Sequence, residues 1–138
     1  MALFDFLKSP KPKNKHSIHN NIGEFSYIEF DGTKNYKGII NSSISKNIEL
    51  LFPISGNEIT NYQTAYFKKI ENNWNSILKQ IKNHNSQIDF DKYAVVNITI
   101  PDEENKFYDM DAEIVLENNN VIISAILTDT NVDEIIEN

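Results

Sequence analysis

The chain has 138 residues, the usual length of one domain, and its 40% hydrophobic and 24% charged content is typical of a folded globular protein. It contains no cysteine, which excludes disulfides, thiolate nucleophiles and cysteine-based zinc or iron–sulfur sites. The formal net charge is −7 and arginine is absent, so we expect no nucleic-acid partner, whereas a basic protein partner is permitted.

Residues 1–16 differ in character from the rest of the chain. MALFDFLK is a short apolar cluster, and SPKPKNKH is a tether whose two prolines disfavour both helix and central strand. The cluster is too short for stable membrane insertion and lacks the features of a signal peptide. We predict that residues 1–16 dock on their own domain or are disordered, with a surface or membrane contact as the alternative. Residues 17–138 form a single domain, and the expected compartment is the cytoplasm.

The region from residue 24 to residue 54 has the pattern of strands. FSYIEF alternates apolar and polar side chains, and the turn dipeptide Asp31-Gly32 separates it from the run YKGII. NIELLFPI supplies a third strand, and Pro53 marks its end or an edge position. This pattern predicts a three-stranded antiparallel meander.

Residues 60–83 carry the clearest helical periodicity. Thr60 and Gln63 have the spacing of a capping box at the helix start. Apolar side chains then recur at intervals of three and four along one stripe, and they are Phe67, Ile70, Trp74, Ile77, Leu78 and Ile81. The pattern predicts one long amphipathic helix over residues 60–83.

Strand patterns return after the helix. YAVVNITIP alternates up to Pro101, FYDMDAEIVLE alternates over residues 107–117, and VIISAILT follows a turn at residues 118–120. The tail NVDEIIEN is expected to be one helical turn or a frayed end. The predicted fold is therefore α+β: an antiparallel sheet of two meanders, about five to seven strands in all, with the one long helix packed on one face.

Carboxylates form the candidate functional group. Asp109, Asp111 and Glu113 lie two residues apart, so on a strand they point the same way at spacings of ~7 Å. Such a row is typical of a solvated strand face, and we interpret it as a surface for a basic partner. The alternative is a divalent-cation site serving a small metal-dependent hydrolase or transferase. The predicted contact residues are Asp102, Glu103, Glu104, Asp109, Asp111 and Glu113.

Other chemistries have little support in the sequence. His16 and His19 share the region of the tether, and His84 falls at the expected helix C-terminus, where an imidazolium suits the dipole. The four glycines do not spell a phosphate-binding loop. We therefore predict no enzyme activity, no catalytic residues, no cofactor and no metal.

The order of segments carries a resemblance to known proteins. MALFDFLK, the strands with YKGII and NIELLF, the helix AYFKKIENNWNSIL and a terminal meander together resemble small uncharacterised bacterial domain families. Such families are often associated with polymorphic toxin systems, in which small acidic proteins act as immunity factors. The resemblance implies a non-enzymatic immunity or antitoxin-like binding protein, and it supplies no catalytic residues.

Overall fold

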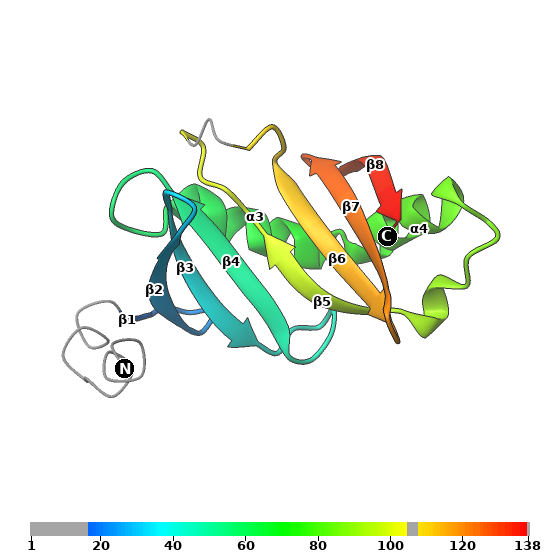
Figure 1. Cartoon of the computed structure of the whole chain (residues 1–138), viewed down its shortest axis with the longest axis horizontal. Helices are drawn as coiled ribbons and strands as arrows, with labels where there is room; N and C mark the ends of the chain where they lie inside the picture. The colour runs from blue at the N-terminus through cyan, green and yellow to red at the C-terminus, as the bar shows by residue number, and fades with distance from the viewer. Residues whose placement is uncertain (1–16, 105–107, 138) are drawn as a thin grey trace.

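A computed structural model describes residues 17–104 and 108–137 of the chain. They form one eight-stranded sheet in which the strands lie side by side in chain order (Figure 1). The strands are β1 (Ser17–His19), β2 (Glu24–Phe30), β3 (Thr33–Ile40), β4 (Ile48–Ile54), β5 (Ala94–Thr99), β6 (Ala112–Asn118), β7 (Val121–Thr128) and β8 (Asn131–Glu137). The predicted segment 1–16 lies outside the described residues.

The sheet is mixed, so the prediction of an antiparallel sheet is wrong. Every neighbouring pair is antiparallel except β4 and β5, which run parallel, with Leu50 opposite Ile98. Parallel neighbours need a long crossover between them. The crossover consists of α3 (Asn61–Asn72), α4 (Trp74–His84) and the short 3-10 helix η1 (Phe90–Lys92). The two predicted meanders exist, and the parallel pair joins them.

The predicted single helix over residues 60–83 is also wrong, because the helical segment breaks at Asn73. The backbone there has φ −111° and ψ 15°, and the Asn73 side-chain amide donates to the carbonyl oxygen of Lys69 at 2.8 Å. Asparagine side chains compete for backbone hydrogen bonds in this way, which favours helix ends over helix interiors. The predicted capping box between Thr60 and Gln63 is confirmed at the start of α3.

The tight turns follow the predicted chemistry at the positions that need a left-handed backbone. Asp31 and Gly32 have φ of 52° and 73° between β2 and β3, and Asn119 has φ 57° between β6 and β7. Asp129, with φ 55°, forms an unpredicted turn into β8. The tail is therefore a strand and not a helical turn, because β7 offers it a backbone ladder and the core takes the side chain of Val132.

Helices α3 and α4 lie on the same side of the sheet (Figure 1), where the hydrophobic core sits. Phe25, Leu50, Phe52, Ile70 and Ile77 are fully buried there. None of the helices in the described ranges is long and apolar enough to cross a membrane.

The other side of the sheet has no helix of the described chain packed over its centre, and we call it the open face. Strand alternation assigns its side chains. They include Ser17, His19, Glu24, Ser26, Ile28, Phe30, Thr33, Asn35, Lys37, Ile39, Glu49, Leu51, Pro53, Ala94, Asn97, Thr99, Glu113, Val115, Glu117, Ile122, Ser124, Ile126, Glu134 and Ile136.

Candidate functional site

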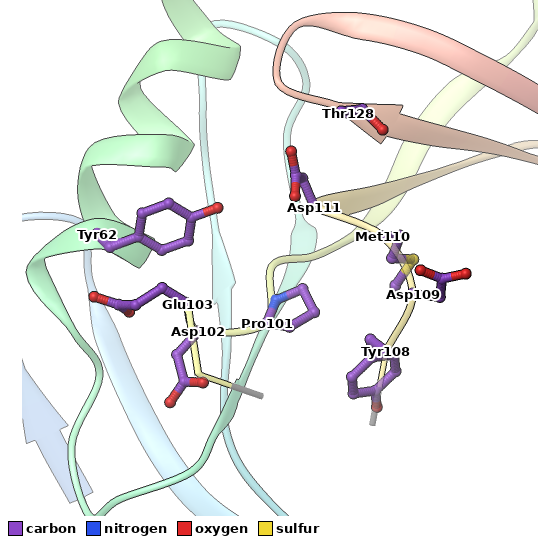
Figure 2. A pocket seen from close by; sticks show the side chains of 9 residues that line it. All are labelled: Tyr62, Pro101, Asp102, Glu103, Tyr108, Asp109, Met110, Asp111 and Thr128. Atoms are coloured by element: carbon purple, nitrogen blue, oxygen red, sulfur yellow. The ribbon is translucent and has the colours of Figure 1, made fainter. Parts of the chain in front are cut away.

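An acidic pocket with a volume of about 330 Å³ opens at one end of the sheet (Figure 2). The chain leaves β5 on one side of this pocket and enters β6 on the other, and the first turn of α3 stands beside it. Its lining consists of Tyr62, Pro101, Asp102, Glu103, Tyr108, Asp109, Met110, Asp111 and Thr128. Four of these nine side chains are carboxylates and none is basic, so the described lining is selective for positive charge.

Asp102 is a structural part of the pocket wall. It is 7% exposed and accepts hydrogen bonds from the Ser55 N–H at 2.6 Å, the Ser55 hydroxyl at 2.9 Å and the Glu104 N–H at 3.2 Å. Its own N–H donates to the Pro53 carbonyl oxygen at 3.0 Å. Asp102 thereby joins the loop after β4 to the segment after β5, and its carboxylate is already occupied.

Glu103 lies on the exposed rim of the pocket. Its carboxylate accepts a hydrogen bond from the hydroxyl of Thr60, the N-cap of α3, at 3.0 Å. Glu104 faces a second hollow of about 420 Å³ that shares the wall formed by Asp102. This second hollow is lined by Gly56, Asn57, Glu58, Thr60, Asp102 and Glu104. Glu58 therefore adds an acid that sequence reasoning missed.

Asp109, Asp111 and Glu113 do not share a strand face, so that prediction is wrong. β6 begins at Ala112, and the two aspartates lie in the bend that precedes it, where both line the pocket. Glu113 is on β6, opposite Thr99, and belongs to the open face. The paired register of β6 with β7 begins at Ala112, and residues 109–111 before it form a bend in which the Asp111 N–H still donates to Leu127.

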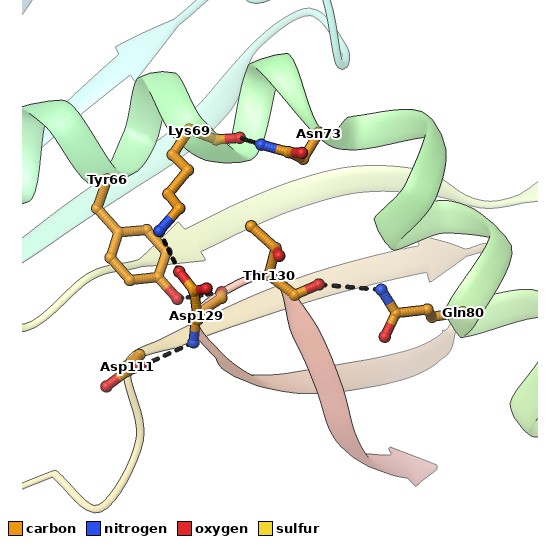
Figure 3. Close-up of polar contacts among 7 residues, drawn as sticks. All are labelled: Tyr66, Lys69, Asn73, Gln80, Asp111, Asp129 and Thr130. Carbon is orange, nitrogen blue, oxygen red and sulfur yellow. Dashed lines mark hydrogen bonds and ion pairs between the residues drawn. The ribbon is translucent and has the colours of Figure 1, made fainter.

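Asp111 also anchors the turn between β7 and β8 (Figure 3). Its carboxylate accepts a hydrogen bond from the Asp129 N–H at 2.8 Å, and its own N–H donates to the Leu127 carbonyl oxygen at 3.0 Å. From α3, the Tyr66 hydroxyl donates to the Asp129 carbonyl oxygen, and Lys69 forms an ion pair with the Asp129 carboxylate. These contacts fix the position of Asp111 against the helix layer.

From α4, the Gln80 side chain binds the backbone on the other side of that turn. Its amide nitrogen donates to the Thr130 carbonyl oxygen at 2.9 Å (Figure 3). Its amide oxygen accepts from the Val132 N–H at 2.9 Å. One feature of the sequence pointed to contacts on this side of the helical segment: Tyr66, Lys69 and Asn73 share one side of a helix at spacings of three and four. Their partners in the turn could not be read from the sequence.

Burial, and after it the negative charge around the pocket, raises the pKa of two tyrosines on α3. Burial, followed by the charges of Asp111, Glu103 and Asp129, raises the pKa of Tyr62 above 10.0. Burial is also the main cause that raises the pKa of Tyr66, and the charge of Asp111 is again the next largest cause. Both phenols stay protonated at neutral pH, and the hydroxyl of Tyr62 points toward the space beside Asp111 (Figure 2).

Tyr66 makes the stability of the fold decrease as the pH becomes alkaline. The unfolded chain releases the phenol proton near pH 10 while the folded protein retains it, so stability is full below pH 10 and falls as the pH rises above it. For Tyr66→Phe we expect this fall to become shallower by about 1.4 kcal/mol per pH unit. Urea unfolding at pH 7, 9, 10 and 11 checks it. The lost hydrogen bond costs about 1 kcal/mol at every pH, so curves that stay parallel would contradict the prediction.

The divalent-cation site that stood as the alternative has no geometric counterpart in the ranges 17–104 and 108–137. No group of three or more His, Asp or Glu side chains there is arranged to hold a metal ion. The imidazole of His84 lies 3.3 Å from the Val132 carbonyl oxygen, at the helix end where it was expected. His19 lies on β1 opposite Glu24, and His16 falls outside the described residues.

No protein-family model, no curated protein and no solved structure matches this chain. The function of the pocket is therefore inferred from its own residues.

Proposed function

We propose that this protein is a non-enzymatic binding module that receives a basic side chain of a partner protein in the acidic pocket. The observation that carries the proposal is the convergence of Glu103, Asp109 and Asp111, from two separate segments, on one hollow with no basic residue in its described lining. Asp102 holds the wall in place, and Glu104 extends the acidic surface into the adjoining hollow. Glu113, on the open face, is not part of this contact.

A lysine or arginine side chain suits the pocket in both charge and shape. Carboxylates on the rim would bind the cationic head group, and arginine offers a planar fork that matches carboxylates in pairs. The rings of Tyr62 and Tyr108 line the same hollow and offer aromatic surface to the alkyl stem or to the cation itself. Charge complementarity of this kind speeds association and selects among partners.

An immunity or antitoxin-like role in the cytoplasm is the biological setting that we propose for this binding. In that setting the module blocks a basic partner protein by occupying part of its surface. The net charge of −7 and the acidic pocket support such a partner, because opposite charges steer the two proteins together.

The test removes two exposed pocket charges without changing side-chain size. In Glu103→Gln combined with Asp109→Asn, we expect the association rate with the basic partner to fall about tenfold at low salt, and the salt dependence to flatten. The partner is first captured from the lysate of the source cells with the tagged full chain, and the purified pair is then measured by surface plasmon resonance at two salt concentrations.

A matched control removes two charges elsewhere. Glu117→Gln combined with Glu134→Gln changes the net charge equally but lies on the open face. Association should be nearly unchanged in this control. An equal loss in both variants would mean that overall acidity attracts the partner, and an unchanged rate in the pocket variant would disprove the pocket.

A further inference from the structure

Four of the five exposed large hydrophobic side chains in the described part of the chain lie on the open face. Ile39, Phe30, Ile136 and Ile122 are exposed large hydrophobic side chains, with Ile39 at 60%. Between them, Leu51, Val115 and Ile126 are only partly covered. Exposed apolar side chains gathered on one face, here interspersed with polar ones, mark a candidate interaction site.

The same face is acidic, which limits what can bind it. Glu24, Glu49, Glu113, Glu117 and Glu134 lie on it. Lys37 is the only lysine among its assigned side chains, and it pairs with Glu49 at 3.8 Å. A complementary ligand must therefore be both apolar and basic.

We infer that residues 1–16 of the same chain bind the open face and cover it. This segment combines the two required properties, since an apolar cluster is followed by evenly spread positive charge. The apolar residues are Leu3, Phe4, Phe6 and Leu7, and the lysines are Lys8, Lys11, Lys13 and Lys15, against the one acid Asp5. Its apolar residues match the exposed isoleucines of the open face in chemistry, and its lysines match the glutamates in charge.

The length of the segment is sufficient for this contact. Ser17 opens β1, the edge strand, and the centre of the open face, between β4 and β5, lies three to four strand spacings away, about 14–19 Å at ~4.8 Å each. Ten residues separate Phe6 from Ser17 and span about 30 Å when extended. Covalent attachment gives the segment an effective concentration of about millimolar at the face, so a modest intrinsic affinity suffices.

A second copy of the folded domain is a poorer occupant. Two open faces placed against each other would bring five glutamates of one protomer against five of the other, and like charges in contact cost free energy. The inferred contact instead joins opposite charges within one chain.

A paramagnetic label in the full-length protein tests the contact. The chain has no cysteine, so Ser9→Cys provides a single attachment point for a nitroxide. We expect the methyl signals of Ile39, Ile122 and Ile126 to lose intensity, and to recover when the nitroxide is reduced. The amides of Asn75 and Lys79, exposed on α4, should keep theirs.

Two further samples distinguish the inferred contact from random collisions of the segment and from contact between two molecules. Serine at the four apolar positions of the labelled segment should restore the open-face signals, with these substitutions: Leu3→Ser, Phe4→Ser, Phe6→Ser and Leu7→Ser. In a mixture of nitroxide-labelled protein with isotope-labelled protein free of nitroxide, the signals should stay intact. Loss of the open-face signals in that mixture would show that the face contacts a second copy of the protein. In the labelled full-length protein itself, no loss of signal, or equal loss on the open face and on α4, would overturn the inference.

Discussion

Gly38→Ala is expected to lower the free energy of unfolding by about 3 kcal/mol, because β2 and β3 leave no room for a methyl group there. A Cβ atom at Gly38 would lie 2.5 Å from the Glu24 carbonyl oxygen and 2.8 Å from the Phe25 ring. Both obstacles are rigid: one is backbone, and Phe25 is fully buried. Urea unfolding followed by tryptophan fluorescence measures the change, with Trp74 as the single reporter.

Gly56→Ala is the matched control for this substitution. No heavy atom lies within 4 Å of a Cβ built at Gly56, and its φ is not in the left-handed region. The same chemical change there should alter stability by less than about 0.5 kcal/mol. Equal effects at the two glycines would show that chain flexibility, and not the steric contact at Gly38, sets the result.

Gln63→Leu is expected to cost about 3 kcal/mol, because the Gln63 side chain satisfies three backbone groups in the core. Its amide nitrogen donates to the carbonyl oxygens of Pro53 at 2.7 Å and Ile100 at 2.8 Å, and its amide oxygen accepts from the Thr60 N–H at 2.9 Å. Leucine has a similar volume but leaves the Ile100 carbonyl and the Thr60 N–H without this partner. The free energy of unfolding in urea again gives the measurement.

Gln87→Leu controls for the chemistry of that change. Gln87 is exposed in the loop after α4, and its backbone N–H, not its side chain, donates to the Asn85 side chain. We expect stability to change there by less than about 0.5 kcal/mol. A small loss at both positions would mean that the buried carbonyls find other partners when Gln63 is replaced.

Local chemistry made part of this fold predictable. The hairpin turn at Asp31-Gly32 and the capping box at Thr60 depend on residues close together in the chain, and both are confirmed. The parallel pairing of β4 with β5 depends on contacts across the whole crossover, and no short pattern encodes it. The break at Asn73 had a local signal in the asparagine-rich run 72–75, but the apolar stripe continues through it and concealed the break.

The candidate site was predictable in composition and not in geometry. The acids at 102–104 and 109–111 were identified from charge alone, and the structure brings most of them to one pocket. The sequence did not predict that these acids are separated from Glu113. Residues two apart fit a strand pattern equally well before and after Ala112, where β6 begins. Tyr62 and Thr128 were missed as lining residues, since each arrives from an element distant in the sequence.

The contact of Gln80 with the last strand also bears on self-association. β8 is an edge strand, and its outward backbone groups would ordinarily offer a template for another chain to extend the sheet. Gln80 occupies two of those groups, at Thr130 and Val132, as an added strand would. The opposite edge, β1, is only three residues long. One amide side chain on α4 thus closes the longer edge of the sheet where β8 begins, and it protects that end from edge-to-edge aggregation.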